Sequence, residues 1–357
     1  MARRVFLHVG TMKSGTSYLR SLWWQNQPAL AARGLLLPGD GKGSHFHAAC
    51  QVARREEVLA LQTPQEARAW ETLLAETAGT PGDALIGQDH FSRATPEQAA
   101  GALAELGAVA GEVHVLLTAR DLGRQLGSAW QQDVKEGSAE TLADFWHRAA
   151  TEGAAGDFWS HHDVPAILER WSQGVPADRV HLVVLPDPAS AARTWLWERV
   201  CEVTGVDPVG LKSEAERSNE SLGAAQGELL RRINAAMPPQ HRTLDTVRFL
   251  KGFFTRQILA AGDGPRIAVP QAMHDWTREH ARRMVEDLQQ RPWQVVGDLE
   301  DLLPAATPVP GRDPADVTGD DVADAAVDAL AAQLLRSLGQ RDRIRSLRAE
   351  VRRLRDS

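Results

Sequence analysis

Residues 5–19 read VFLHVGTMKSGTSYL, and this stretch decides how the rest of the chain is interpreted. Residues 5–9 predict a buried strand, and the residues from Thr16 onward predict a helix. Between them lies a turn bounded by Gly10 and Gly15, where the backbone can approach a ligand closely because glycine has no Cβ. A strand that leads through a tight turn into a helix N-terminus aims backbone N–H groups and the positive end of the helix dipole at one place. The sequence therefore predicts an anion-binding loop.

The side chains of this loop suit a phosphate or sulfate group. Lys13 adds a positive charge, and the chain contains only five lysines, so a lysine inside this turn is unlike the background. Further hydroxyl donors come from Thr11, Ser14, Thr16 and Ser17. A nucleotide P-loop places its lysine after the second glycine, as GxxxxGK[ST], whereas Lys13 precedes Gly15. The order of residues thus indicates a phosphate loop of a different kind.

Two later strand ends carry polar residues of interest. Residues 113–119 form an apolar run that ends in Arg120, and Ser128 follows eight residues later on a predicted helix. The arginine fork suits a phosphate, and a serine hydroxyl adds one more donor. Residues 84–87 form another apolar run, which ends in Asp89 and His90. Ligands bind at the carboxyl ends of strands in a parallel α/β sheet, so either residue is a candidate general base.

Other polar stretches remain open to two interpretations. His45 and His47 follow a glycine-rich loop and are further candidates for the base, or they begin a helix. Tryptophans and histidines gather in residues 142–163, where they either line an acceptor site or pack inside a helical subdomain. The polar segment 217–222 is a candidate loop over the bound donor, or it caps the next helix.

The motifs and their order resemble the superfamily of sulfotransferases that use 3′-phosphoadenosine 5′-phosphosulfate (PAPS). In that family Lys-Ser-Gly-Thr-Thr, or a close variant, holds the 5′-phosphosulfate, and residues 13–17 here read KSGTS. The resemblance implies that residues 11–17 hold the donor, that Tyr18 stacks on the adenine, and that Arg120 and Ser128 bind the 3′-phosphate. Two departures are Leu122, where the family often has proline, and Asp89, where it usually has Glu or His.

The resemblance also implies a fold and a reaction. The fold is an α/β, P-loop-like central parallel sheet flanked by helices, with a C-terminal helical extension; four apolar strands alternating with helices favour it independently. The reaction moves a sulfuryl group from PAPS to a hydroxyl or amine of a carbohydrate, glycolipid or small natural product, leaving 3′-phosphoadenosine 5′-phosphate. Lys13 would stabilise the leaving phosphate, Asp89 or His90 would take the acceptor's proton, and no metal is required.

Two alternatives stay open. One is a P-loop kinase-like phosphotransferase, against which stand the displaced Lys13 and the lack of an obvious acidic strand end of the Walker B type. The other is a non-catalytic protein that keeps a nucleotide pocket and works in assembly through its C-terminal helix. Magnesium dependence would favour the first alternative, and indifference of function to Lys13→Ala would favour the second.

The composition indicates in which compartment the protein is expected and which partners it is not expected to have. The formal net charge of −7 argues against a nucleic-acid partner. Cys50 and Cys201 lack metal-ligand spacing and indicate a reducing compartment. The apolar run at residues 5–9 is too short for a signal peptide, and no stretch reaches the length of a membrane span. We therefore expect a cytoplasmic enzyme.

The composition also divides the chain into three parts. Residues 1–303 are expected to form the α/β domain, 304–321 a linker, and 322–357 a C-terminal helix. The spacing of Ile344, Leu347, Val351 and Leu354 is typical of a short coiled-coil seam. This helix is either a handle for self-association or another partner, or a solvated helix.

Overall fold

The structure is a computed structural model and describes residues 1–153, 156–188, 190–215, 221–259, 264–308 and 310–355. The chain forms two compact units. The first comprises Met1–Leu126, Arg148–Asn219 and Ala272–Thr307, and the second comprises Gly127–His147, Glu220–Gln271 and Pro308–Ser357. This grouping differs from the division expected from composition, because two stretches within 1–303 belong with the C-terminal helix.

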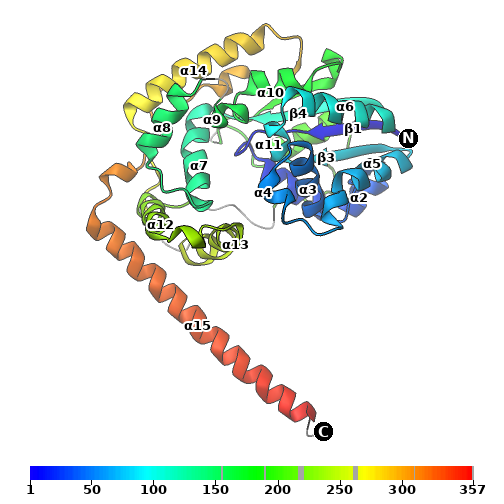
Figure 1. The fold of residues 1–357 in the computed structure, drawn as a ribbon. Coiled ribbons are helices and arrows are strands. Elements are labelled where there is room, and N and C mark those ends of the chain that lie inside the picture. Colours follow the sequence, from blue (N-terminus) through cyan, green and yellow to red (C-terminus); the bar gives the residue numbers. More distant parts are fainter. Residues whose placement is uncertain (154–155, 189, 216–220, 260–263, 309, 356–357) are drawn as a thin grey trace. The chain divides into compact units, whose positions relative to one another are not determined.

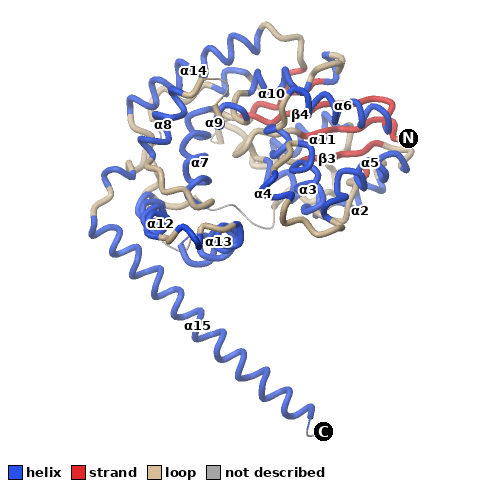
Figure 2. Tube along the Cα trace, viewed as in Figure 1, coloured by secondary structure: helices blue, strands red, loops and turns tan. Residues whose placement is uncertain are grey.

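A six-stranded parallel sheet, built from the described residues, forms the centre of the first unit (Figure 1, Figure 2). Its order is β2 (Leu35–Leu36), β3 (Asp83–Gly87), β1 (Ala2–His8), β4 (Ala110–Ala119), β5 (Val180–Val184) and β6 (Gln294–Val296). The four inner strands are the four apolar runs of the sequence. With helices packed around them, they confirm the α/β fold class.

The order of the strands determines where a ligand site can form. From β1 the chain moves to β2 and β3 on one side and then crosses to β4 on the other, so β1 lies between β3 and β4. In parallel sheets this reversal leaves a crevice at the carboxyl ends of the strands. The segments that follow β1, β3 and β4 therefore meet at one edge, and these are the segments with the predicted site residues.

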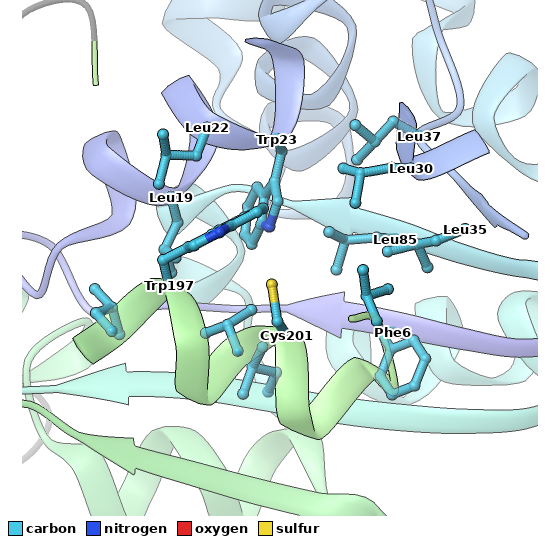
Figure 3. Packing of buried hydrophobic residues seen from close by; sticks show 14 of the residues in the cluster. Phe6, Leu19, Leu22, Trp23, Leu30, Leu35, Leu37, Leu85, Trp197 and Cys201 are labelled. Carbon is cyan, nitrogen blue, oxygen red and sulfur yellow. The ribbon is translucent and has the colours of Figure 1, made fainter. Parts of the chain in front are cut away.

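One face of the sheet is closed by aromatic and aliphatic packing (Figure 3). Phe6 of β1 and Leu85 of β3 lie in one cluster with residues of α1 (Thr16–Gln25), α2 (Gln27–Ala32) and α11 (Trp195–Thr204). Leu116 of β4 belongs to the same cluster. Trp23 of α1 and Trp197 of α11 are almost fully buried in this cluster. Burying a large aromatic side chain contributes about 2–3 kcal/mol, so this packing fixes α1, and with it the loop, on the sheet.

The helix expected from Thr16 to about residue 33 is interrupted at Asn26. Its side-chain amide donates to the carbonyls of Leu22 and Lys212, both at 2.9 Å, and its oxygen accepts from the Lys212 N–H at 2.8 Å. Pro28 then suits the first turn of a new helix, because its missing N–H needs no partner there. A tertiary contact thus divides one predicted helix into α1 and α2.

The remaining elements of the first unit surround the sheet. They are α3 (Lys42–Val52), α4 (Glu56–Leu59), η1 (Glu66–Arg68), α5 (Ala69–Gly79), η2 (Asp89–Arg93), α6 (Pro96–Val109), α9 (Asp157–Ser160), α10 (Val164–Trp171), η3 (Ala177–Arg179), α14 (Gln271–Gln289) and η7 (Leu299–Leu302). The boundary between the units falls within α7 (Leu122–Lys135) and α8 (Leu142–Thr151).

The second unit is helical. It contains α12 (Ala224–Ala236), η4 (Pro239–His241), α13 (Leu244–Phe249), the π-helix η5 (Leu250–Ile258), η8 (Pro314–Asp316) and α15 (Gly319–Arg355). α15 covers most of the segment 322–357 that the sequence predicts as a C-terminal helix. It packs on α12, and its residues Val322, Ala325 and Ala329 are buried. Within the described part of the chain, no helix has the length and apolarity needed to cross a membrane.

Candidate active site

The loop between β1 and α1 has the backbone of a tight anion cradle. Gly10, Lys13 and Gly15 adopt positive φ angles of 62°, 68° and 84°. At Gly10 a Cβ would lie 2.8 Å from a methyl carbon of Thr16, and at Gly15 it would lie 2.5 Å from a methyl carbon of Leu196. Both positions therefore favour glycine through their backbone conformation, and a side chain there would also have to displace Thr16 or Leu196. The positive φ angle of Lys13 is uncommon for residues other than glycine.

Two of the predicted donors hold the loop together instead of facing outward. The Thr11 hydroxyl donates to the Thr118 carbonyl at 3.1 Å, and the Ser14 hydroxyl donates to the Thr11 carbonyl at 2.6 Å. The hydroxyls of Ser14 and Thr118 are also 2.8 Å apart, and Thr11 and Ser14 are completely buried. These contacts anchor the loop to the end of β4. Ser17 is exposed, and Lys13 is half-buried.

The N-terminus of α1 begins at Gly15, and no side chain among the described residues caps it. The first-turn Thr16 hydroxyl donates sideways to an oxygen of Asp89 at 3.0 Å. The other oxygen of Asp89 accepts from the Arg20 guanidinium at 3.1 Å. Asp89 therefore ties η2 to the start of α1, and both oxygens of its carboxylate are engaged.

A second set of contacts surrounds Met12, next to Lys13. The Gln125 side-chain amide donates to the Met12 carbonyl at 3.0 Å, and its nitrogen also lies 3.0 Å from Nδ1 of His162. The Arg93 guanidinium lies 3.2 Å from Nε2 of His161 and 3.9 Å from the sulfur of Met12. The tip of the loop is thus held by side chains from α7, from η2 and from the segment after α9.

The electrostatic field at this edge is positive. Burial lowers the pKa of His162 to about 3, and the charges of Arg93, Arg120 and Lys13 lower it further. His161 is buried beside it, and burial with the neighbouring His162, Arg93 and His90 holds its pKa well below the usual range. Both rings are therefore neutral near pH 7, while three cations gather around them. Such a field attracts an anion.

Arg120 ends β4 as the sequence predicts. Burial lowers the pKa of its guanidinium to about 10, so it remains charged. Its Nη2 donates to the Arg124 carbonyl in the first turn of α7. Asp121 accepts from the Arg124 backbone N–H at 2.9 Å and also contacts the Arg124 side chain, so this carboxylate caps α7. The charge of Asp121 also raises the pKa of Arg120, but by less than burial lowers it.

The other residues predicted to bind the donor have different surroundings. The Tyr18 hydroxyl donates to the Ser213 carbonyl at 2.8 Å, its ring packs on the core cluster, and burial raises its pKa to about 12. Ser128 lies on α7 in the second unit, so its pairing with Arg120 stays a prediction. Of the predicted segment 217–222, residues 217–220 lie outside the described residues.

Among the candidate bases, two histidines have structural partners on both ring nitrogens. His45 Nε2 contacts the Pro38 carbonyl at 2.8 Å, and its Nδ1 accepts from the Gly87 N–H at 3.2 Å. His47 contacts Glu66 at 3.0 Å and Gln62 at 3.1 Å. His90 lies on η2, directly after Asp89, with its ring against the edge of Phe46.

Sequence reasoning missed Arg20, Arg93 and Gln125 as neighbours of the loop. Arg20 lies one turn into α1 on the side of Ser17, and its spacing could have suggested an anion contact. Gln125 and Arg93 carry no motif, because their role depends on which strand ends are adjacent. The acid that the sequence appeared to lack at a neighbouring strand end is Asp89, which directly contacts the loop residue Thr16.

No model of a protein family matches the chain, and a search of the curated proteins finds no relative. A search of solved structures finds the sulfotransferase domain of the olefin synthase from Synechococcus PCC 7002. It is 14% identical, has a TM-score of 0.34, and the match covers 79% of this chain and 94% of that one. Because this likeness is distant, the function is inferred from the residues of the site alone.

Proposed function

We propose that this chain is a PAPS-dependent sulfotransferase. It would transfer the sulfuryl group to a hydroxyl or amine of a carbohydrate, glycolipid or small natural product. The observation that carries the proposal is the gathering of Lys13, Arg93 and Arg120 around His162, which Gln125 links to the loop before α1. A donor with a 5′-phosphosulfate and a separate 3′-phosphate offers two anions, which suits a site with several cations.

In this proposal the loop binds the 5′ end of the donor. The bond between sulfur and the bridging phosphate oxygen breaks while a bond from the acceptor oxygen or nitrogen to sulfur forms. Charge then builds on the departing phosphate, where Lys13 and the first backbone N–H groups of α1 would stabilise it. Arg120 would bind the 3′-phosphate through its fork of donors, with Ser128 as a second donor and Tyr18 against the adenine.

The acceptor's proton would pass to a base after β3. His90 is the stronger candidate of the two predicted residues, because Asp89 already accepts hydrogen bonds on both oxygens from Thr16 and Arg20. An ion-paired carboxylate is a weak base, since the pairing favours its charged form. We therefore assign Asp89 to positioning Thr16 and the start of α1, and His90 to proton transfer.

Calorimetric titration with 3′-phosphoadenosine 5′-phosphate tests the donor site. Adenosine 5′-phosphate, ADP and ATP with Mg²⁺ serve as comparators, and Arg120→Ala serves as the variant. We expect tight binding that depends on the 3′-phosphate and is lost in the variant. Equal binding of the comparators, or no binding of any nucleotide, would contradict the proposal.

One contact favours a second candidate, a magnesium-dependent phosphotransferase. An acid at the end of a strand beside β1 that contacts the hydroxyl after the loop is the arrangement of a Walker B residue, and Asp89 and Thr16 have it at 3.0 Å. Arg20 stands against this reading, because its guanidinium neutralises the carboxylate that a metal would need. Nucleotide binding that requires Mg²⁺ would establish the phosphotransferase in place of the sulfotransferase.

A further inference from the structure

The second half of α15 is exposed on every side. In residues 334–348 and 351–353 each described side chain is exposed, whereas Val322, Ala325 and Ala329 in the first half are buried. An isolated helix is marginal in water unless it packs against something, because each turn must be ordered for few contacts. Beyond Arg336, whose guanidinium lies over the Phe253 ring, about four turns of this helix are exposed in the part of the chain that the structure describes, and they therefore point to an external partner.

Large apolar side chains mark two faces of this helix. Val327, Leu330, Leu334 and Leu338 recur at helical spacing, roughly opposite the buried alanines, and between 38% and 69% of each is exposed. Farther along, Ile344, Leu347 and Val351 form a second exposed row. Each half of α15 thus carries an apolar row that its own unit leaves uncovered.

The two halves carry opposite charge. Residues 319–335 contain four aspartates and no lysine or arginine, whereas residues 336–355 contain eight arginines and two acidic residues. Asp321 is paired with Arg312, while Asp320, Asp324 and Asp328 are exposed. The helix dipole favours acids in the first turn and bases in the last, but its effect does not extend beyond those turns. Asp328 and Arg341 to Arg348 lie well outside them, so the segregation needs another explanation.

We propose that two copies of this chain associate through α15 in antiparallel orientation, with the acidic first half of each helix against the basic second half of the other. This arrangement pairs the two apolar rows and complements their charges, and the same contact occurs twice about a two-fold axis. A parallel pair would instead place the arginine-rich halves against each other, and like charges across a helix seam are unfavourable.

The two rows set the register of the pair. When the row from Val327 to Leu338 lies beside the row from Ile344 to Val351 of the second copy, the two-fold axis crosses α15 near Gln340.

Cysteine crosslinking of the full-length protein tests the orientation. In the antiparallel pair two Arg348 positions lie roughly 24 Å apart along the axis, at 1.5 Å per residue, so Arg348→Cys should not crosslink to itself. A mixture of Arg348→Cys and Gln333→Cys should crosslink with a short bismaleimide. The native Cys50 and Cys201 are buried and serve as the unreactive background. Self-crosslinking of Arg348→Cys would show a parallel pair and overturn the proposal.

A charge swap tests the cause of association. Sedimentation equilibrium should find a dimer, and Asp324→Lys with Asp328→Lys, or Arg348→Glu with Arg352→Glu, should each weaken it about tenfold or more. All four changes together should restore it. The two sets lie more than a Debye length apart within one helix, so rescue must come from contact between copies. A monomer at all concentrations with unchanged circular dichroism, or four changes that fail to restore dimers, would refute the proposal.

Discussion

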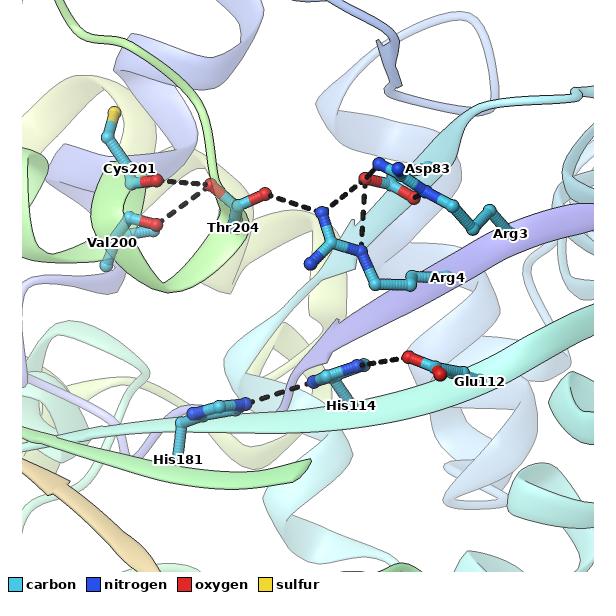
Figure 4. A network of polar contacts seen from close by, with 9 residues as sticks. All are labelled: Arg3, Arg4, Asp83, Glu112, His114, His181, Val200, Cys201 and Thr204. Atoms are coloured by element: carbon cyan, nitrogen blue, oxygen red, sulfur yellow. Dashed lines mark hydrogen bonds and ion pairs between the residues drawn. The ribbon is translucent and has the colours of Figure 1, made fainter. Parts of the chain in front are cut away.

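The amino and carboxyl ends of the central sheet each carry a cluster of polar side chains, and the two clusters differ in how their charges are arranged. At the amino end, Asp83 accepts from Arg3 at 2.6 Å and from Arg4 at 2.6 Å, and Arg4 also donates to the Thr204 carbonyl at 3.2 Å (Figure 4). Burial alone would raise the pKa of Asp83, but the hydrogen bonds from the two arginines outweigh it and lower the pKa. Both arginines are therefore paired with the same acid.

Beside this cluster, His114 links Glu112 at 3.3 Å to His181 at 3.1 Å (Figure 4). At the carboxyl end, in contrast, Lys13, Arg93 and Arg120 surround the neutral His162, and the carboxylates of Asp89 and Asp121 are engaged by Arg20 and Arg124. The comparison teaches that the paired arginines at the amino end serve the fold, whereas several cations gathered beside the start of α1 suit a bound anion.

The largest expected effect is at the carboxyl end. Lys13→Ala should lower transfer by about 10²–10³-fold, because it removes a preorganised cation from the charge that develops on the leaving group. Lys13 is half-buried, so thermal unfolding must be measured beside activity. Arg3→Ala at the amino end is the matched control and should leave transfer unchanged. Near-normal transfer by a folded Lys13→Ala protein would refute this assignment.

Arg120→Ala should have the next largest effect. It should weaken binding of 3′-phosphoadenosine 5′-phosphate by about 10–100-fold and leave adenosine 5′-phosphate nearly unaffected, because one charge-assisted contact to the 3′-phosphate is lost. Arg120→Lys should recover only part, since lysine lacks the planar fork. Calorimetry with both nucleotides gives the comparison, and an equal loss for the two would argue against a 3′-phosphate contact.

At the amino end the expected effect is on stability. Asp83→Asn should lower the free energy of unfolding by about 2 kcal/mol, because it leaves Arg3 and Arg4 without their shared acid. Denaturant unfolding measures this change, and calorimetry should find nucleotide binding unaltered. A loss of nucleotide binding in a stable Asp83→Asn protein would mean that the two ends do not differ in role.

The smallest effect concerns pH. A buried histidine with a lowered pKa stays neutral in the folded protein while the unfolded chain takes up a proton below about pH 6.5, so stability falls as pH decreases from there toward the folded value. For His162, with a pKa of about 3, the loss is about 1.4 kcal/mol per pH unit, and His162→Gln should remove that slope. His181→Gln should remove the same slope over a shorter pH range, since the pKa of His181 is lowered only to about 4, so its total effect on stability is smaller. Equal total losses of stability between about pH 6.5 and pH 3 in the two variants would contradict this difference.

The sequence by itself determined the local parts of this protein. Apolar runs predicted the four inner strands, and the glycines around Lys13 predicted the loop and the helix start, because these features depend on residues that are neighbours in the chain. The edge strands β2 and β6 have two and three residues, too few for a clear pattern. The length of α15 was predicted closely for the same local reason.

Only the tertiary structure decided what the polar side chains do. Thr11 and Ser14 turn inward because Thr118, more than a hundred residues away, ends the adjacent strand. Asp89 meets Thr16, and Gln125 meets Met12, because the order of the strands brings those ends together. A residue's type fixes which hydrogen bonds it can make, but the partner that is within 3 Å depends on the packing of the whole sheet, and no local pattern records that.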